Sequence, residues 1–203
     1  CIDAGARAVM PAFNDINGVP CSVSRKLLRD ILREDWGFDG MTVSDSNAIA
    51  ECVNHGIAED KRDAAKQAIL AGMDMDMSSN SYIENMKELV ESGEVPMDVL
   101  DEAVANILRV KFELGLFDDP YRTDSQRESQ TMGRPEYRAL AREAAQKSMV
   151  LLKNDGVLPL AKEKKIGIIG ALASDRGEMT GAWAIGANGD DCISLTDACD
   201  ARG

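Results

Sequence analysis

The sequence predicts an α/β fold with parallel strands, and the alternation of two patterns in its first 117 residues supports this prediction. Short apolar runs of strand length occur at 8–13, 41–44 and 73–77, and stretches with helical periodicity lie between them. Strands that are separated by helices pair in parallel, because each return to the same end of the sheet needs a crossover. This alternation fits a barrel and a doubly wound sheet equally well.

The first helix is expected after Ser24, which is a good N-cap residue. Four apolar side chains then share one helical face: Leu27, Leu28, Ile31 and Leu32. The segment WGFDG at 36–40 ends this helix, and the strand at 41–44 follows and leads directly into Asp45.

A second helix is expected at 61–71, because Gly72 stands where a helix C-cap belongs. Two more helices are expected near 82–91 and 98–114. In the last of these, the apolar side chains on one face are expected in the core: Leu100, Val104, Ile107 and Leu108.

The composition changes after Phe117. Residues 118–134 are polar and charged and are bordered or interrupted by Pro and Gly, which predicts a linker. A helix at 136–152, a buried strand at 166–170 (IGIIG) and a helix start at Thr196 are expected beyond it. One strand and two helices bury too little surface for a core, so residues 135–203 are expected to begin a second domain.

The composition excludes several classes of protein. The chain is 44% apolar and 29% charged, as is usual for a globular protein. No stretch approaches the roughly 20 apolar residues of a membrane span. The net charge of −12 argues against nucleic-acid binding, which needs clustered basic side chains. The sequence leaves the oligomeric state undetermined.

The five cysteines are scattered, and no pair has the CxxC spacing of a zinc or redox site: Cys1, Cys21, Cys52, Cys192 and Cys199. Reduced thiols favour a cytoplasmic location, and a periplasmic or secreted one stays open. The chain begins without Met or a signal peptide, so we expect it to start inside a domain.

Asp45 is the main candidate for chemistry. A carboxylate directly after a short buried strand lies where barrel enzymes place catalytic groups, because the strand fixes the backbone and the loop exposes the side chain. From its position alone, an aspartate that caps the next turn is the more common interpretation.

Five motifs in order strengthen the catalytic reading: FNDINGVP at 13–20, WGFDG at 36–40 with VSD at 43–45, AGMDMDM at 71–77, LRVKFELGLF at 108–117, and VLLKN with LPL at 150–160. Together they resemble glycoside hydrolase family 3, the β-glucosidase group. The resemblance implies that residues 1–117 form the C-terminal half of a β/α (TIM-type) barrel. It also implies that 118–134 form a linker and that 135–203 begin an α/β sandwich domain.

The resemblance implies a retaining, exo-acting enzyme that removes terminal β-D-glucosyl residues from oligosaccharides or glycosides, with Asp45 as nucleophile. In this family the acid/base is usually a Glu on the second domain, and no residue of this chain is assigned to that role. The 203-residue chain alone is therefore expected to be inactive. No metal or organic cofactor is implied, because an acid, a nucleophile and water suffice.

Four residues are candidates for binding the sugar. Phe13 stands where relatives carry an aromatic near the sugar, and Met77 could line the sugar pocket, although core packing is the more ordinary role of both residue types. Trp183 resembles a family Trp near the domain interface, where packing is an equally good reading. Ser46 marks a departure, because many relatives carry Trp there, stacked on the sugar at the aglycone side.

Three other residues are weaker candidates. Asp74 and Asp76 could bind sugar hydroxyls or a cation, but two carboxylates at i and i+2 make a poor metal motif, and capping is the better interpretation. His55 has no Cys or Ser nucleophile near it in the sequence, which favours a structural role.

The sequence also suggests other functions, within the family and outside it. A β-xylosidase, an α-L-arabinofuranosidase or an exo-glucanase would keep the family and change the sugar. A non-catalytic sugar-binding descendant would keep the fold alone. A nucleotide-binding module, suggested by the run at 166–170, lacks the GxGxxG spacing that cradles phosphates.

Overall fold

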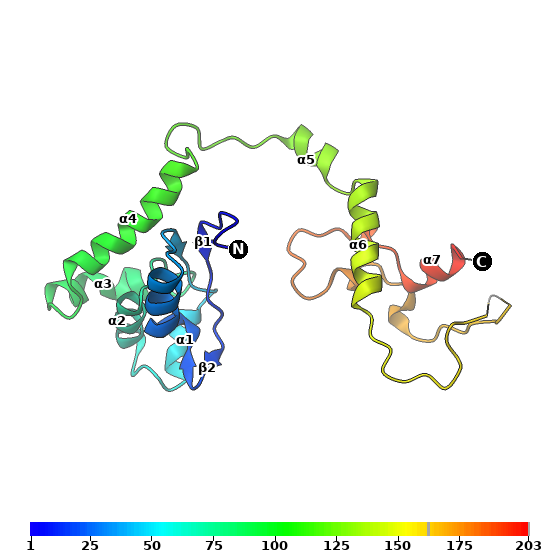
Figure 1. The fold of residues 1–203 in the computed structure, drawn as a ribbon, viewed down its shortest axis with the longest axis horizontal. Coiled ribbons are helices and arrows are strands. Elements are labelled where there is room, and N and C mark those ends of the chain that lie inside the picture. The colour runs from blue at the N-terminus through cyan, green and yellow to red at the C-terminus, as the bar shows by residue number, and fades with distance from the viewer. Residues whose placement is uncertain (162, 203) are drawn as a thin grey trace. The chain divides into compact units, whose positions relative to one another are not determined.

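The computed structural model describes residues 1–161 and 163–202. The chain forms two compact units, Cys1–Arg122 and Thr123–Gly203, coloured from blue to green and from light green to red in Figure 1. Lys162 and Gly203 belong to the expected second domain and lie outside the described residues.

The first unit alternates short strands and helices. Its strands are β1 (Ala8–Val9), β2 (Asp15–Ile16), β3 (Val19–Pro20) and β4 (Met41–Thr42). Its helices are the 3₁₀ turn η1 (Cys21–Val23), the π-helix η2 (Lys26–Asp35), α1 (Ala48–Asn54), α2 (Lys61–Ala71), α3 (Ser81–Glu91) and α4 (Met97–Glu113).

Three segments of this unit pair in parallel, as the sequence predicts for an α/β fold. Strand β1 pairs with β4, with Ala8 opposite Met41, and Val43 forms a parallel bridge with Met75. The paired segments are shorter than the apolar runs at 8–13, 41–44 and 73–77. One reason is Pro11, which has no N–H for a ladder. Strands β2 and β3 make a separate antiparallel pair.

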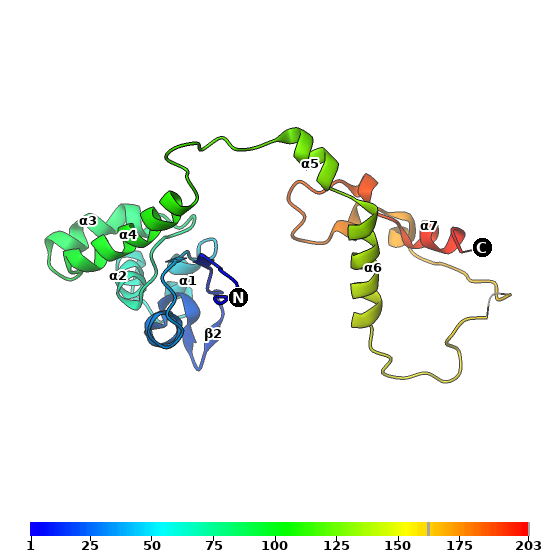
Figure 2. The same cartoon turned by 45° about the horizontal axis from the view of Figure 1, so that its top comes forward.

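Helix α2 is the centre of the packing and has the predicted bounds, with Gly72 after it in the left-handed conformation at φ 102°. One face buries Ala64, Ala68 and Ala71 against side chains of η2 and α1, and the other buries Ala65 and Ile69 against α3 and α4. The small alanines let neighbouring helices approach closely on both sides. Figures 1 and 2 both show α2 between α1 and α3.

The predicted core face of α4 is partly wrong. Leu100 packs half-buried against the core and Ile107 is half-buried, but Val104 and Leu108 are 45% and 39% exposed. The fully buried residues are Ala103, Asn106 and Val110. Two polar contacts turn the other face inward, because Asn106 donates a hydrogen bond to buried Asp74 and Glu102 pairs with Arg29 on η2.

The second unit contains α5 (Ser125–Thr131), α6 (Pro135–Ser148), α7 (Leu195–Asp200) and the 3₁₀ turns η3 (Ala171–Ser174), η4 (Glu178–Thr180) and η5 (Gly189–Asp191). Ser194 caps α7 with a reciprocal capping box, one residue before the helix begins. Helix α6 begins at Pro135, and it ends four residues earlier than the sequence predicts.

The polar segment 118–134 contains helix α5, because Asp124 accepts hydrogen bonds from the first-turn amides of Gln126 and Arg127. One expectation for this unit is wrong. The run at 166–170 forms no strand, and Ile169 is 98% exposed. A strand needs a paired neighbour, and the described part of this unit supplies none.

Among the residues described, no helix has the length and apolar character needed to cross a membrane.

Candidate active site

Asp45 lies between a parallel strand and a helix. Val43, which pairs in parallel with Met75, lies two positions before Asp45, and α1 begins after it at Ala48. Asn47 makes the turn into the helix with a left-handed backbone at φ 63°, a conformation that Asn tolerates better than most residues. Asp45 is half-buried, so its backbone is fixed while its carboxylate stays accessible.

Three hydrogen bonds hold Asp45. Its carboxylate Oδ1 accepts the backbone N–H of Ser46 at 2.7 Å. Its carbonyl oxygen accepts the Ser44 hydroxyl at 3.0 Å and the N–H of Ala48 at 3.1 Å. Carboxylate Oδ2 receives no hydrogen bond from the described residues, so one oxygen is held and the other is available to a ligand.

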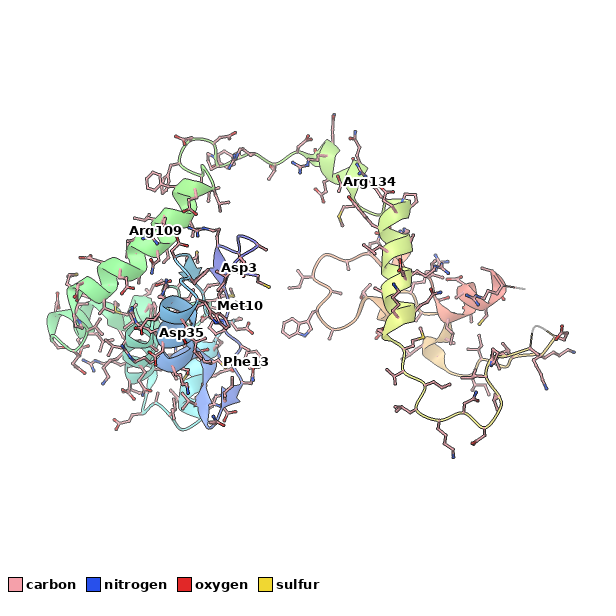
Figure 3. All side chains as sticks on the ribbon, in the orientation of Figure 1. Asp3, Met10, Phe13, Asp35, Arg109 and Arg134 are labelled. Carbon is pink, nitrogen blue, oxygen red and sulfur yellow. The ribbon has the colours of Figure 1, made fainter. Side chains whose placement is uncertain are left out.

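Three of the four candidate sugar-binding residues follow the ends of parallel segments. Phe13 lies past β1 (Figure 3), Ser46 past β4, and Met77 past the bridge at Met75. Parallel segments end at one edge of a sheet, so these residues belong to the same edge as Asp45. Phe13 is 43% exposed, Met77 is 36% exposed, and Ser46 is exposed as well.

The loop that carries Met77 is bonded to the loop that carries Asp45. Asn47 donates its N–H to the carbonyl oxygen of Met77 at 2.9 Å, and Met77 donates its own N–H to the Ser44 hydroxyl at 2.8 Å. Trp183 lies in the second unit, between η4 and η5, and is 88% exposed.

Asp74 is the centre of a buried polar network that sequence reasoning missed. Its carboxylate accepts hydrogen bonds from the Arg33 guanidinium at 2.7 Å, from the N–H of Thr42 at 2.7 Å and from the Asn106 amide at 3.1 Å. Burial raises the pKa of Asp74, and the hydrogen bonds from Thr42 and Asn106 and the charge of Arg33 oppose this rise. Its oxygens are occupied by protein donors, so Asp74 is structural.

The other weak candidates also have local structural roles. Asp76 accepts the Ser79 hydroxyl at 2.6 Å and the N–H of Tyr82 at 3.2 Å, in the first turn of α3. His55 is the C-cap residue of α1, and its backbone N–H donates to the carbonyl oxygen of Glu51. Among residues 1–161 and 163–202, no cluster of three metal-ligating side chains occurs.

The five cysteines are free thiols in the structure. Burial in the core beside α2 raises the pKa of Cys52 to about 11, so this thiol stays protonated and unreactive at neutral pH.

Residues 1–110 match the family model described as the glycosyl hydrolase family 3 N terminal domain, and the chain belongs to this family of glycosidases. The crystal structure of a beta-glucosidase from Listeria innocua in complex with glucose superposes with a TM-score of 0.81 at 40% identity, over 98% of this chain and 28% of that chain.

Curated relatives give the same family. A periplasmic beta-glucosidase of Salmonella typhimurium is 43% identical over 188 residues, which are 90% of this chain and 25% of that protein. A beta-xylosidase of Formosa agariphila is 37% identical over 195 residues, which are 90% of this chain and 27% of that protein. The chain therefore spans about a quarter of the length of these relatives.

Proposed function

We propose that this chain is part of a retaining, exo-acting glycoside hydrolase that removes terminal β-D-glucosyl residues from oligosaccharides or glycosides. The observation that carries the proposal is Asp45, a half-buried carboxylate at the end of a parallel strand, with one oxygen that receives no hydrogen bond from the described residues. The relatives named beta-glucosidases and the related structure with bound glucose support the choice of sugar.

The proposed architecture places Asp45 on a barrel. Residues 1–117 form the C-terminal half of a β/α barrel, 118–134 a linker, and 135–203 the beginning of an α/β sandwich domain. Parallel pairing of β1, β4 and Met75, with helices between them in the chain, supports the barrel part. The carboxyl ends of barrel strands are where such enzymes collect their catalytic groups.

The proposed reaction has two displacements. Oxygen Oδ2 of Asp45 bonds to the anomeric carbon, the bond to the aglycone oxygen breaks, and that oxygen takes a proton from a carboxylic acid about 5–5.5 Å from Asp45. The same acid, now a carboxylate, then removes a proton from water, whose oxygen bonds to the anomeric carbon and releases Asp45. We assign the acid to a Glu outside this chain.

The sugar-binding assignments in the first unit rest on the position of these residues at the edge of the sheet that carries Asp45. Phe13 and Met77 present half-exposed apolar surface near Asp45, which suits the apolar faces of a sugar ring. Ser46 offers no aromatic platform at the aglycone side, so binding there relies on other groups. Trp183 is an exposed aromatic, and it is kept as a proposed sugar-binding residue on the resemblance to the family alone.

A β-xylosidase is the second candidate, because a named beta-xylosidase covers 90% of this chain at 37% identity. Both enzymes would use the same nucleophile and differ in the groups around the C5 substituent of the sugar.

Trapping of the covalent intermediate tests the proposal. The full-length protein is treated with a 2-deoxy-2-fluoro-β-glucoside with a good leaving group, and the labelled peptide is found by mass spectrometry. We expect a glycosyl adduct on Asp45 that is lost in Asp45→Asn and kept in Asp35→Asn, a matched change at an exposed carboxylate on η2 (Figure 3). Labelling of another residue would refute the nucleophile, and labelling by the fluoro-xyloside alone would favour the xylosidase.

A further inference from the structure

The strand before Asp45 begins a regular parallel ladder with the segment at Met75. Met75 donates its N–H to the carbonyl oxygen of Thr42 at 3.0 Å, and Ser44 donates its N–H to the carbonyl oxygen of Met75 at 2.9 Å. In a regular parallel ladder the next two bonds would run from the N–H of Met77 to the carbonyl oxygen of Ser44, and from the N–H of residue 46 to the carbonyl oxygen of Met77.

The ladder departs from this pattern at Ser44. Met77 donates its N–H to the hydroxyl Oγ of Ser44 at 2.8 Å, in place of the carbonyl oxygen. The next bond to Met77 then comes from the N–H of Asn47 at 2.9 Å, one residue later than a regular ladder requires. One extra residue is thus accommodated on this side, which is the definition of a bulge.

The bulge releases the backbone around Asp45 from the ladder. The N–H of Ser46, which would otherwise bond to Met77, donates instead to Oδ1 of Asp45 at 2.7 Å. The Ser44 hydroxyl also donates to the carbonyl oxygen of Asp45 at 3.0 Å. Ser44 is fully buried, and its hydroxyl is both acceptor and donor in this arrangement.

We propose that Ser44 is the positioning residue for Asp45: its hydroxyl replaces a ladder carbonyl, and this replacement sets the backbone that aims the carboxylate. Ser44 touches no substrate. It acts through Met77 on one side and Asp45 on the other, and it leaves Oδ2 as the attacking oxygen. This inference rests on the proposed function, because it concerns the same site.

The size of the effect follows from geometry. Without the Ser44 hydroxyl, the N–H of Met77 loses its acceptor and is drawn to the carbonyl oxygen of Ser44, which restores the regular ladder and moves residues 45 and 46. A misplacement of about 1 Å at a reacting group costs on the order of 10²-fold in rate. We expect Ser44→Ala to slow attack on the anomeric carbon by roughly 10- to 100-fold.

Two variants at this position and one control make the test. Ser44→Ala removes the hydroxyl, and Ser44→Cys keeps a side chain of similar shape with a weaker donor and acceptor. Ser22→Ala is the matched control, because Ser22 is equally buried in the same unit and its hydroxyl has no hydrogen-bond partner among the described residues.

The measurement uses the full-length protein. The rate constant for covalent trapping by a 2-deoxy-2-fluoro-β-glucoside is determined per mole of folded protein, alongside the inhibition constant of glucose. We expect the trapping rate to fall in the order Ser22→Ala, Ser44→Cys, Ser44→Ala, with the glucose constant changed less than about threefold. A residue that only stabilised the fold would lower the folded fraction and leave this rate unchanged.

The outcomes separate this inference from the proposed function. If the unaltered protein is not labelled at Asp45, the proposed function fails. If it is labelled and both Ser44 variants are trapped as fast as the Ser22→Ala control, the positioning role is refuted and the nucleophile stands. If Ser44→Ala does not fold, Ser44→Cys decides, since a rate equal to that of the control also refutes the role.

Discussion

Replacing Asp74 with Asn is expected to destabilise the first unit more than any surface change. The carboxylate of Asp74 is buried with a side-chain exposure of 4%, and its partner Arg33 is 12% exposed. Asp74→Asn keeps the size of the side chain and removes the charge, so the guanidinium of Arg33 is left buried without a counter-ion. The amide also brings an N–H₂ group toward donors from Thr42 and Asn106.

The expected loss in the free energy of unfolding follows from the burial of the Arg33–Asp74 pair. Breaking a buried ion pair by removing one partner costs about 3–5 kcal/mol, because the remaining charge stays desolvated. A half-exposed pair is worth about 0–1 kcal/mol. The Arg29–Glu102 pair also joins a guanidinium and a carboxylate, at 2.9 Å and with exposures of 18% and 41%, so Glu102→Gln is the control.

Hydrogen exchange measured by mass spectrometry on peptides of α2 reports the opening of this unit in the intact protein. The loss of about 3–5 kcal/mol corresponds to exchange that is faster by a factor of roughly 10² to 10⁴ in Asp74→Asn. In Glu102→Gln the factor stays under about 10.

A double-mutant cycle with Arg33→Met isolates the pair. Since removing both charges leaves no buried charge unpaired, the double variant is expected to be more stable than the sum of the single changes predicts. Additive effects, or exchange in Asp74→Asn no faster than in Glu102→Gln, would show that the pair is not what holds the segment at 73–77.

Three further changes test other parts of the structure. Ser46→Trp adds an aromatic platform beside Asp45, and we expect KM for aryl β-glucosides to fall by roughly 5- to 160-fold, the equivalent of about 1–3 kcal/mol of stacking; an unchanged KM would remove Ser46 from the aglycone side. The Arg62 guanidinium lowers the pKa of Glu94 to about 2. Because the folded pKa lies below the unfolded value near 4.5, this group stabilises the fold above about pH 4.5 and loses that contribution as pH falls toward 2. Urea unfolding of Glu94→Gln should therefore be less sensitive to pH in this window than unfolding of the parent, and equal slopes would contradict the pairing. Gly72→Ala puts a side chain at φ 102°, with its Cβ 3.1 Å from Cγ of Arg29, and should destabilise the unit by about 1–3 kcal/mol in the same urea assay; no loss would show that the backbone there relaxes freely.

The sequence was most informative where the determinants are local. Helix α2 has the predicted bounds because its start and stop signals lie within the helix and its caps: Asp60 accepts the N–H of Asp63, and Gly72 adopts the left-handed turn. The place of Asp45 after a strand was also readable, since a short apolar run stops directly before it.

The sequence was least informative where a contact with a residue far away in the chain determines the local structure. Val104 and Leu108 of α4 are misassigned to the core because Asn106 turns inward to meet Asp74, 32 positions earlier in the chain. The run at 166–170 has the composition of a strand, yet a strand also requires a neighbour to pair with. The roles of Phe13, Met77 and Trp183 stay predictions, because an exposed apolar side chain suits packing and sugar binding alike.

The bulge at Ser44 has a consequence for how such a site diverges among relatives. Residue 46 serves the carboxylate of Asp45 through its backbone N–H, while its side chain is exposed. Almost any amino acid supplies the same N–H, so the side chain at this position is free to vary with the aglycone. Under the proposed mechanism, a lineage can thus exchange one leaving group for another by changing residue 46, while the backbone N–H that holds Asp45 is kept.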